Sequence, residues 1–161
     1  MESLYDLASE VYDTLKEKSK TITTAESCTG GMIGEALTSV SGISKFYNYG
    51  FITYSNEAKT NLLGVKKETL DAYGAVSCEV VKQMALGALK KSNADISVSV
   101  SGIAGPLGDT KTKKVGLCFI GIATKEGVLK SYKFNFSGQR QEIRMQCAKS
   151  ALNLVIENLN I

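Results

Sequence analysis

The segment Ile96-Ser97-Val98-Ser99-Val100-Ser101 alternates strictly between branched apolar residues and serine. A period of two predicts a β-strand with Ile and Val on one face and small hydroxyls on the other. Because small side chains let helices pack closely on both faces, we expect this strand to lie in the centre of a sheet. The strand therefore favours a layered α/β fold.

Hydrophobic spacing predicts the elements around this strand. Apolar residues at helical spacing predict helices, and β-favouring runs predict strands. The last two strands are separated only by 125–127, which is typical of an antiparallel hairpin. We expect one domain, residues 1–161, folded as a three-layer α/β/α sandwich with a mixed sheet of about five strands, one of them antiparallel. The predicted helices are 2–18, a segment ending near 39, 56–64, 78–92 and 139–159, and the predicted strands are 21–25, 50–55, 96–101, 115–124 and 128–136.

The composition excludes several classes of protein. A net charge of +3 with scattered lysines gives no argument for nucleic-acid binding. No apolar run is long enough to span a membrane, and the acidic start of the chain does not resemble a secretory signal. We therefore expect a cytoplasmic protein that contacts neither nucleic acid nor membrane.

The chain has no histidine and four cysteines that are far apart. Without histidine there can be no Ser-His or Cys-His pair, so a hydrolase of this sequence must move protons with Lys, Tyr, Asp or Glu. Cysteines that form no C-x-x-C pair are most simply reduced thiols. No group of Asp, Glu and Cys has metal-ligand spacing, and we expect neither metal nor cofactor.

Two candidate nucleophiles stand where a strand is predicted to turn into a helix. Ser27 and Cys28 are followed by Thr29, Gly30 and Gly31. The amides at such a junction point outward unpaired, which suits an anion or an oxygen that gains negative charge. A hydroxyl helix cap with glycines for close packing explains the same residues about equally well.

Three other places carry candidate site residues. Lys59 is predicted in the first turn of a helix, near the strand end that carries Tyr54, although most lysines are simply solvated. A second turn of small residues, 101–105, follows the central strand. Arg140 and Arg144 lie four residues apart on one helix face and could bind a phosphate, unless that face is only a solvated basic surface.

Four motifs occur together in order: Ala25-Glu26-Ser27-Cys28-Thr29-Gly30-Gly31, Tyr54-Ser55-Asn56-Glu57-Ala58-Lys59, Gly74-Ala75-Val76-Ser77 and Ser101-Gly102-Ile103-Ala104-Gly105-Pro106. Over residues 5–155 the chain resembles the CinA carboxy-terminal domain family, which includes stand-alone nicotinamide-nucleotide amidases (PncC). The resemblance implies a cytoplasmic bacterial enzyme that converts nicotinamide mononucleotide to nicotinate mononucleotide and ammonia. It also implies a homo-oligomer, most often a dimer.

An amide hydrolase needs a nucleophile, a proton acceptor and support for the oxyanion. We hypothesise that Ser27 attacks, that a neutral Lys59 accepts its proton, and that Tyr54 relays or orients the proton; Cys28 is the rival nucleophile. One glycine turn would hold the oxyanion and the other the phosphate. Two alternatives stay open: a nucleotide-binding module without turnover, and an amidase for a different small amide. The predicted substrate-binding residues are Cys28, Thr29, Gly30, Gly31, Ser101, Gly102, Ile103, Ala104, Gly105, Arg140 and Arg144.

Overall fold

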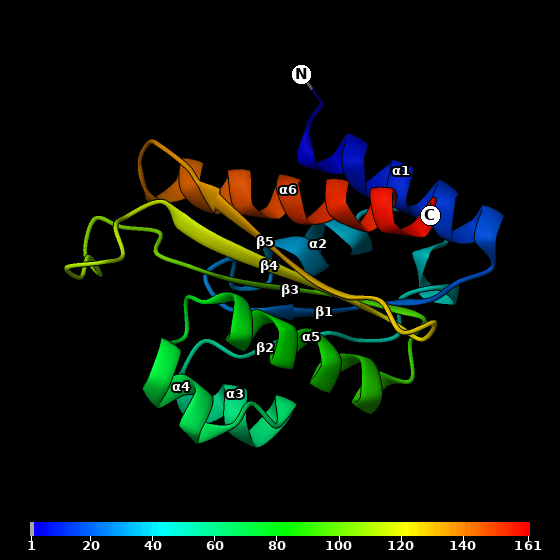
Figure 1. Cartoon of the computed structure of the whole chain (residues 1–161). Helices are drawn as coiled ribbons and strands as arrows, with labels where there is room; N and C mark the ends of the chain where they lie inside the picture. The colour runs from blue at the N-terminus through cyan, green and yellow to red at the C-terminus, as the bar shows by residue number, and fades with distance from the viewer. Residues whose placement is uncertain (1) are drawn as a thin grey trace.

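The computed structural model describes residues 2–161, and its centre is a five-stranded sheet in the order β2-β1-β3-β4-β5 (Figure 1). Strand β1 pairs in parallel with β2 and β3, whereas β4 is antiparallel to both of its neighbours. The predicted mixed sheet with one antiparallel strand is therefore confirmed. The strands are β1 (Ile22–Glu26), β2 (Phe51–Ile52), β3 (Ile96–Gly102), β4 (Leu117–Thr124) and β5 (Leu129–Asn135).

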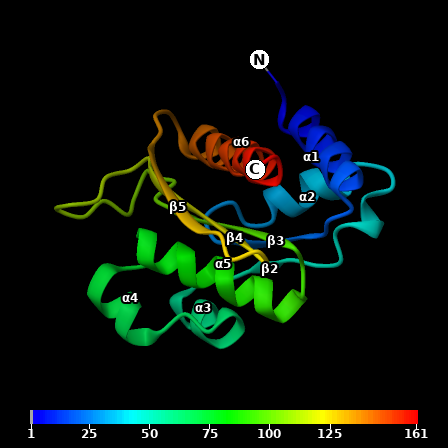
Figure 2. The same ribbon diagram turned by 45° about the vertical axis from the view of Figure 1, so that its right-hand side comes forward.

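Helices cover both faces of the sheet, as the three-layer prediction requires. One face is covered by α1 (Leu4–Lys18), α2 (Met32–Thr38) and α6 (Arg140–Leu159). The other face is covered by α5 (Cys78–Ser92), and α3 (Asn56–Leu63) and α4 (Lys67–Tyr73) pack on the outer side of α5 (Figure 2). A short 3₁₀ turn, η1 (Ile43–Lys45), precedes β2.

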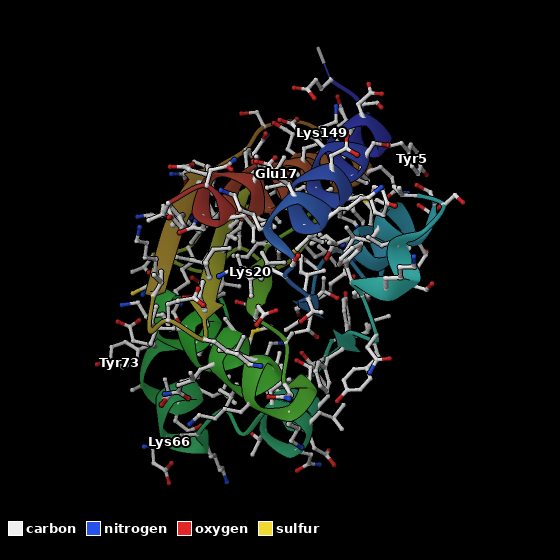
Figure 3. The ribbon with its side chains drawn as sticks, turned by 90° about the vertical axis from the view of Figure 1, so that its right-hand side faces the viewer. Tyr5, Glu17, Lys20, Lys66, Tyr73 and Lys149 are labelled. Atoms are coloured by element: carbon white, nitrogen blue, oxygen red, sulfur yellow. The ribbon has the colours of Figure 1, made fainter. Side chains whose placement is uncertain are left out.

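The outer surfaces of the two layers carry polar side chains. Figure 3 shows Glu17 and Lys149 on the α1–α6 layer and Lys66 beside α4 on the opposite layer. Within residues 2–161, no helix combines the length and the apolar character needed to cross a membrane.

Strand β3 lies in the centre of the sheet, and helix α5 approaches it closely. The hydroxyl of Ser99 donates to the carbonyl oxygen of Val81 in α5 at 2.5 Å. A Cβ at Gly121 in β4 would lie only 2.4 Å from that same carbonyl oxygen. Small residues on this face therefore allow the close helix packing that the serine pattern predicted.

Helix α3 is held against α5 by an even closer approach. A Cβ at Gly87 in α5 would lie 1.8 Å from the carbonyl oxygen of Leu63, the last residue of α3. No side chain fits between the two helices there. The position of α3 relative to the sheet is therefore set by backbone contact with α5.

One prediction from the sequence needs correction, and one helix was missed. The strand expected over 50–55 is only Phe51–Ile52. The amide of Thr53 still donates to the Glu26 carbonyl oxygen at 2.8 Å, but the carbonyl groups of Thr53 and Tyr54 turn away to accept from a buried lysine. Helix α4 was not predicted, because it is seven residues long and buries only Leu70, too little for a helical pattern.

Candidate active site

Ser27 stands at a sharp elbow between β1 and α2. Its amide donates to the Val100 carbonyl oxygen of the neighbouring strand β3 at 3.1 Å, which continues the sheet pairing for one more residue. Gly30 and Gly31 follow with φ of +58° and +106°, values that favour glycine, and they turn the chain into α2. The elbow thus presents a serine directly at the end of a buried strand.

Lys59 lies almost entirely inside the protein, with 1% of its surface exposed. Its Nζ donates to Ser27 Oγ at 3.0 Å, to the Thr53 carbonyl oxygen at 2.9 Å and to the Tyr54 carbonyl oxygen at 3.2 Å. Burial lowers the pKa of Lys59 from 10.5 to about 8. A substantial fraction of this amine is therefore neutral in mildly alkaline solution.

A cavity of about 280 Å³ opens over the Ser27–Lys59 pair. Tyr54 stands at its rim with 64% of its surface exposed, and its hydroxyl accepts from Arg140 Nη2 at 3.3 Å. The Tyr54 hydroxyl therefore lies beside Arg140, and the backbone carbonyl group of Tyr54 contacts Lys59. The cavity is lined by Ser27, Cys28, Tyr54, Asn56, Lys59, Ala75, Val76, Ser101, Gly102, Ile103, Ala104, Leu107, Gly108 and Arg140.

The two arginines of α6 occupy different positions. Arg140 lines the cavity, and its Nη1 donates to the Gly105 carbonyl oxygen at 2.7 Å. Arg144 instead donates to the elbow, from Nε to the Cys28 carbonyl oxygen at 2.9 Å and from Nη2 to the Thr29 carbonyl oxygen at 3.0 Å. One cation faces the cavity, and the other holds the backbone beside the nucleophile.

The structure brings together only part of the predicted binding set. Cys28, Ser101, Gly102, Ile103, Ala104 and Arg140 line the cavity, and Thr29, Gly30, Gly31, Gly105 and Arg144 do not. Sequence reasoning missed Asn56, Ala75, Val76, Leu107 and Gly108 as lining residues, and it missed the backbone contribution of Thr53. The Gly74–Ser77 motif was a signal for two of them, because it matched the family without being assigned to the site.

Cys28 packs in the apolar core with Cys118 and Cys147, and all three are free thiols. Hydrogen bonding to Cys118 and Cys147 lowers the pKa of Cys28, whereas the contacts with Cys147 and Cys28 raise the pKa of Cys118. The Lys59 amine hydrogen-bonds to the hydroxyl of Ser27 and to two carbonyl groups. The geometry therefore pairs the lysine with the serine.

Comparisons with known proteins identify the family of this chain. The family model described as the CinA C-terminal domain matches residues 4–159. This chain belongs to the CinA C-terminal domain family. The resemblance of the four motifs is thereby confirmed.

Curated relatives of this CinA C-terminal domain are of two lengths. A CinA-like protein of Endomicrobium trichonymphae is 52% identical over 153 residues, which cover 95% of this chain but 36% of that protein. The nicotinamide-nucleotide amidohydrolase PncC of Enterobacter agglomerans is 48% identical over 153 residues, 95% of this chain and 93% of that protein. The chain thus spans about a third of the longer relative and nearly all of the shorter one.

The fold of the CinA C-terminal domain is also found in solved structures. The competence/damage inducible protein CihA of Agrobacterium tumefaciens superposes with a TM-score of 0.95 at 39% identity, covering 100% of this chain and 98% of that chain. A CinA superfamily protein of Klebsiella pneumoniae superposes equally well, with a TM-score of 0.95 at 33% identity. The sandwich described above is therefore the fold of the family.

Proposed function

We propose that this chain hydrolyses the carboxamide of nicotinamide mononucleotide to give nicotinate mononucleotide and ammonia. The observation that carries the proposal is the 3.0 Å contact between Ser27 Oγ and the buried Nζ of Lys59. The name of the E. agglomerans relative, which this chain matches over 93% of its length, supplies the substrate. Cytoplasmic location and a role in recycling pyridine nucleotides accompany this proposal.

The surroundings of Lys59 suit a neutral amine that acts as a base. A neutral amine has two N–H donors and one lone pair, and three polar groups lie around this nitrogen. The carbonyl oxygens of Thr53 and Tyr54 can only accept, so they take the two N–H groups. In the neutral form the 3.0 Å contact with Ser27 is therefore reversed, and the hydroxyl donates to the lone pair of Lys59. This is the arrangement that general-base catalysis requires.

The reaction follows in two halves. As Lys59 takes the proton, Ser27 Oγ forms a bond to the amide carbon, and the carbonyl electrons move to oxygen. The C–N bond then breaks, and the protonated Lys59 returns the proton to the departing ammonia. In the second half Lys59 accepts a proton from water, whose oxygen attacks the ester, and passes that proton to Ser27 as the C–O bond of the ester breaks. The acid product then ionises to the carboxylate and releases its proton to solvent.

The oxyanion of the tetrahedral intermediate requires hydrogen-bond donors close to Ser27. The Gly31 amide is already used, because it donates to Glu26 at 3.2 Å. Within residues 2–161, the amides of Cys28 and Ala104 donate to no other protein group, and both residues line the cavity. We assign the oxyanion to these two amides, one from each turn, in place of the single glycine turn that the sequence predicted.

The phosphate of the substrate is assigned to Arg140. Its guanidinium lines the cavity and also borders a neighbouring groove of about 630 Å³ formed by 104–106 and 138–141. A guanidinium binds phosphate oxygens through paired N–H donors, and Tyr54 at the rim can add its hydroxyl. Arg144 is not assigned this role, because it does not line the cavity and its donors hold the elbow carbonyl groups.

The experiment incubates purified protein with nicotinamide mononucleotide and measures ammonia and nicotinate mononucleotide, with Ser27→Ala as the control. Release of both products by the wild type alone supports the proposal. Binding of the nucleotide without ammonia release would indicate a non-catalytic binding module. Turnover of amides without phosphate at equal kcat/KM would indicate an amidase for other small amides.

We also expect a homo-oligomer, most often a dimer. Exposed apolar side chains support association, since Tyr54 and Leu107 at the cavity have 64% and 85% of their surface exposed, and Ile52 in β2 has 55%. Light scattering coupled to size exclusion measures the mass directly. A mass equal to one chain of 17.3 kDa at micromolar concentration would contradict the expectation.

A further inference from the structure

We propose that Glu26 is a positioning residue whose buried carboxylate fixes the elbow and thereby keeps the Ser27 hydroxyl at the Lys59 amine. The proposal rests on the proposed function only for the reaction that is measured. It gives a role to a charged residue that neither contacts the substrate cavity nor takes part in the proton transfers described above.

The carboxylate of Glu26 is 1% exposed and receives four hydrogen bonds, all from the elbow and the first turn of α2. Oε1 accepts from Thr29 Oγ1 at 2.6 Å, from the Gly31 amide at 3.2 Å and from the Ile33 amide at 3.0 Å. Oε2 accepts from the Gly34 amide at 3.0 Å. One side chain thus satisfies a set of donors that the start of a helix otherwise leaves unpaired.

Within residues 2–161, no lysine or arginine forms an ion pair with Glu26. Its charge is stabilised instead by these four donors, three of which are backbone amides with fixed direction. A buried carboxylate held in this way cannot move without leaving several donors unpaired, and each unpaired donor costs about 1–3 kcal/mol. The elbow is therefore rigid relative to the end of β1.

The opposite side of the elbow is held by Arg144. Its guanidinium accepts nothing and donates to the carbonyl oxygens of Cys28 and Thr29. A Cβ at Gly30 would lie 3.3 Å from Arg144 Nη2, which shows how closely the arginine covers the turn. Amides bound by Glu26 and carbonyl groups bound by Arg144 fix the peptide planes that follow Ser27.

Glu26 is also connected to the other half of the catalytic pair. Its backbone carbonyl oxygen accepts from the Thr53 amide at 2.8 Å, and the Thr53 carbonyl oxygen accepts from Lys59 Nζ at 2.9 Å. The residue that fixes the serine by its side chain therefore fixes a lysine partner by its backbone. Loss of the side-chain contacts would shift Ser27 relative to a lysine that stays in place.

The first test is Glu26→Gln, which preserves size. The glutamine amide nitrogen would oppose the amide of Gly34 or the donors on Oε1, so at least one contact is lost. We expect kcat to fall about 10- to 100-fold with KM changed less than about threefold, because a displacement of about 1 Å is enough for such a loss. We expect labelling of Ser27 by a fluorophosphonate, in which its oxygen displaces fluoride, to slow by a similar factor.

The matched control is Asp95→Asn. The Asp95 carboxylate accepts from the amide of Thr21 at 2.8 Å and from its hydroxyl at 3.1 Å, at the opposite end of β1 from Ser27. This variant perturbs a carboxylate that accepts from the backbone beside β1 without touching the elbow. We expect its kcat and its labelling rate to stay near those of the wild type.

A second pair of variants decides the matter if Glu26→Gln does not fold. Thr29→Val removes the 2.6 Å hydrogen bond to Glu26 at constant shape, and Thr29→Ser retains the hydroxyl. We expect the valine variant to lose kcat and labelling, and the serine variant to lie closer to the wild type.

Two results would overturn the positioning role. One is a Glu26→Gln or Thr29→Val protein that turns over and is labelled like the wild type. The other is a loss that Asp95→Asn reproduces when the two proteins have equal thermal stability. Labelling needs no nucleotide, so a labelled wild type that releases no ammonia refutes the proposed substrate, while the variants still decide the role of Glu26.

Discussion

The protein contains two glycine-rich turns at the ends of adjacent parallel strands, and they are built in opposite ways. In the elbow after β1 and the first turn of α2, backbone amides donate to the Glu26 carboxylate, and the elbow carbonyl groups accept from Arg144. The turn over 101–105 after β3 leaves the Ala104 amide unpaired within residues 2–161 and presents its backbone to the cavity. Most polar groups of the first turn are paired internally, with the Cys28 amide left for the oxyanion, and the second turn presents its backbone to a ligand.

This difference distinguishes the turn that orients the nucleophile from the turn that binds the substrate, which the sequence does not distinguish. Both turns have the small residues typical of an anion-binding backbone, and each was a candidate for the oxyanion or the phosphate. A turn whose polar groups are mostly paired can orient a nucleophile and hold the oxyanion with its remaining amide, but it has little left to bind the rest of a substrate. We therefore expect substitutions in the elbow to change kcat and substitutions around 101–108 and Arg140 to change KM.

The largest effect on kcat is expected at the nucleophile, Ser27, where the elbow begins. Ser27→Ala removes the attacking oxygen, and kcat for ammonia release should fall by about 10³-fold or more. Cys28→Ala, the matched control one residue away, should keep kcat within about tenfold, because its thiol packs with Cys118 and Cys147. Steady-state ammonia assays on both proteins measure this, and a reversed order would make Cys28 the nucleophile.

Replacement of the base should have the next largest effect. Lys59→Met keeps the length of the side chain but removes the proton acceptor, so kcat should fall by about 10²- to 10⁴-fold. The exposed Lys66 is the matched control, and Lys66→Met should leave kcat unchanged. Because the pKa of Lys59 is about 8, wild-type kcat/KM should rise with pH up to about 8 and then level off. A profile that is flat between pH 6 and 9 would contradict the lysine as base.

The same amine makes a prediction for stability. Its pKa is about 8 in the folded protein and 10.5 in the unfolded chain, so between these values the unfolded chain binds more protons. Wild-type stability should therefore rise with pH from about 8 to 10.5, by up to about 3 kcal/mol. Lys59→Met lacks this titration, so its free energy of unfolding relative to the wild type should fall over that range. Denaturant unfolding at pH 7, 8, 9 and 10 measures the trend, and parallel curves would refute the shifted pKa.

A smaller effect, on KM, is expected at Arg140, which lines the substrate cavity beside the second turn. Arg140→Gln removes the cation that lines the cavity, and KM for nicotinamide mononucleotide should rise about tenfold with kcat changed much less. The corresponding nucleoside without phosphate should be turned over equally by both proteins. A kcat loss that is the same for both substrates would move Arg140 into the catalytic machinery.

The smallest effect is expected at the rim. Leu107 is 85% exposed and lines the cavity from the loop after the second turn. Leu107→Ala should change KM by about two- to threefold and the free energy of unfolding by less than about 0.5 kcal/mol. A tenfold change in kcat would show that the loop contributes to the chemistry.

Much of the fold could be predicted because its signals are local. The alternation of 96–101 gave the central strand, and the apolar stripe of 78–92 gave α5 with the same bounds as in the structure. The end of β2 could not be predicted, since Thr53 and Tyr54 leave the sheet to meet a side chain that comes later in the sequence. Residue patterns can predict a strand, but they do not predict a tertiary contact that ends it early.

The candidate site could be predicted in part for a similar reason. Ser27 and Lys59 each follow a recognisable strand end, and the structure places their side chains 3.0 Å apart; their catalytic roles stay predictions. The division between Arg140 and Arg144 could not be predicted, because residues four apart on a helix face look equivalent in sequence. The buried state of Glu26 depends on donors from 29–34, which only the folded elbow brings around it.

The contact between Gly87 and the end of α3 has a consequence for how this protein can vary. The helix that carries the amine rests on α5 through bare backbone, so any larger residue at position 87 must push it outward. A random mutagenesis screen should therefore recover inactive proteins with substitutions at Gly87, although this residue lies outside the cavity and carries no reactive group. Anyone who engineers new substrate specificity into this scaffold should hold that glycine constant.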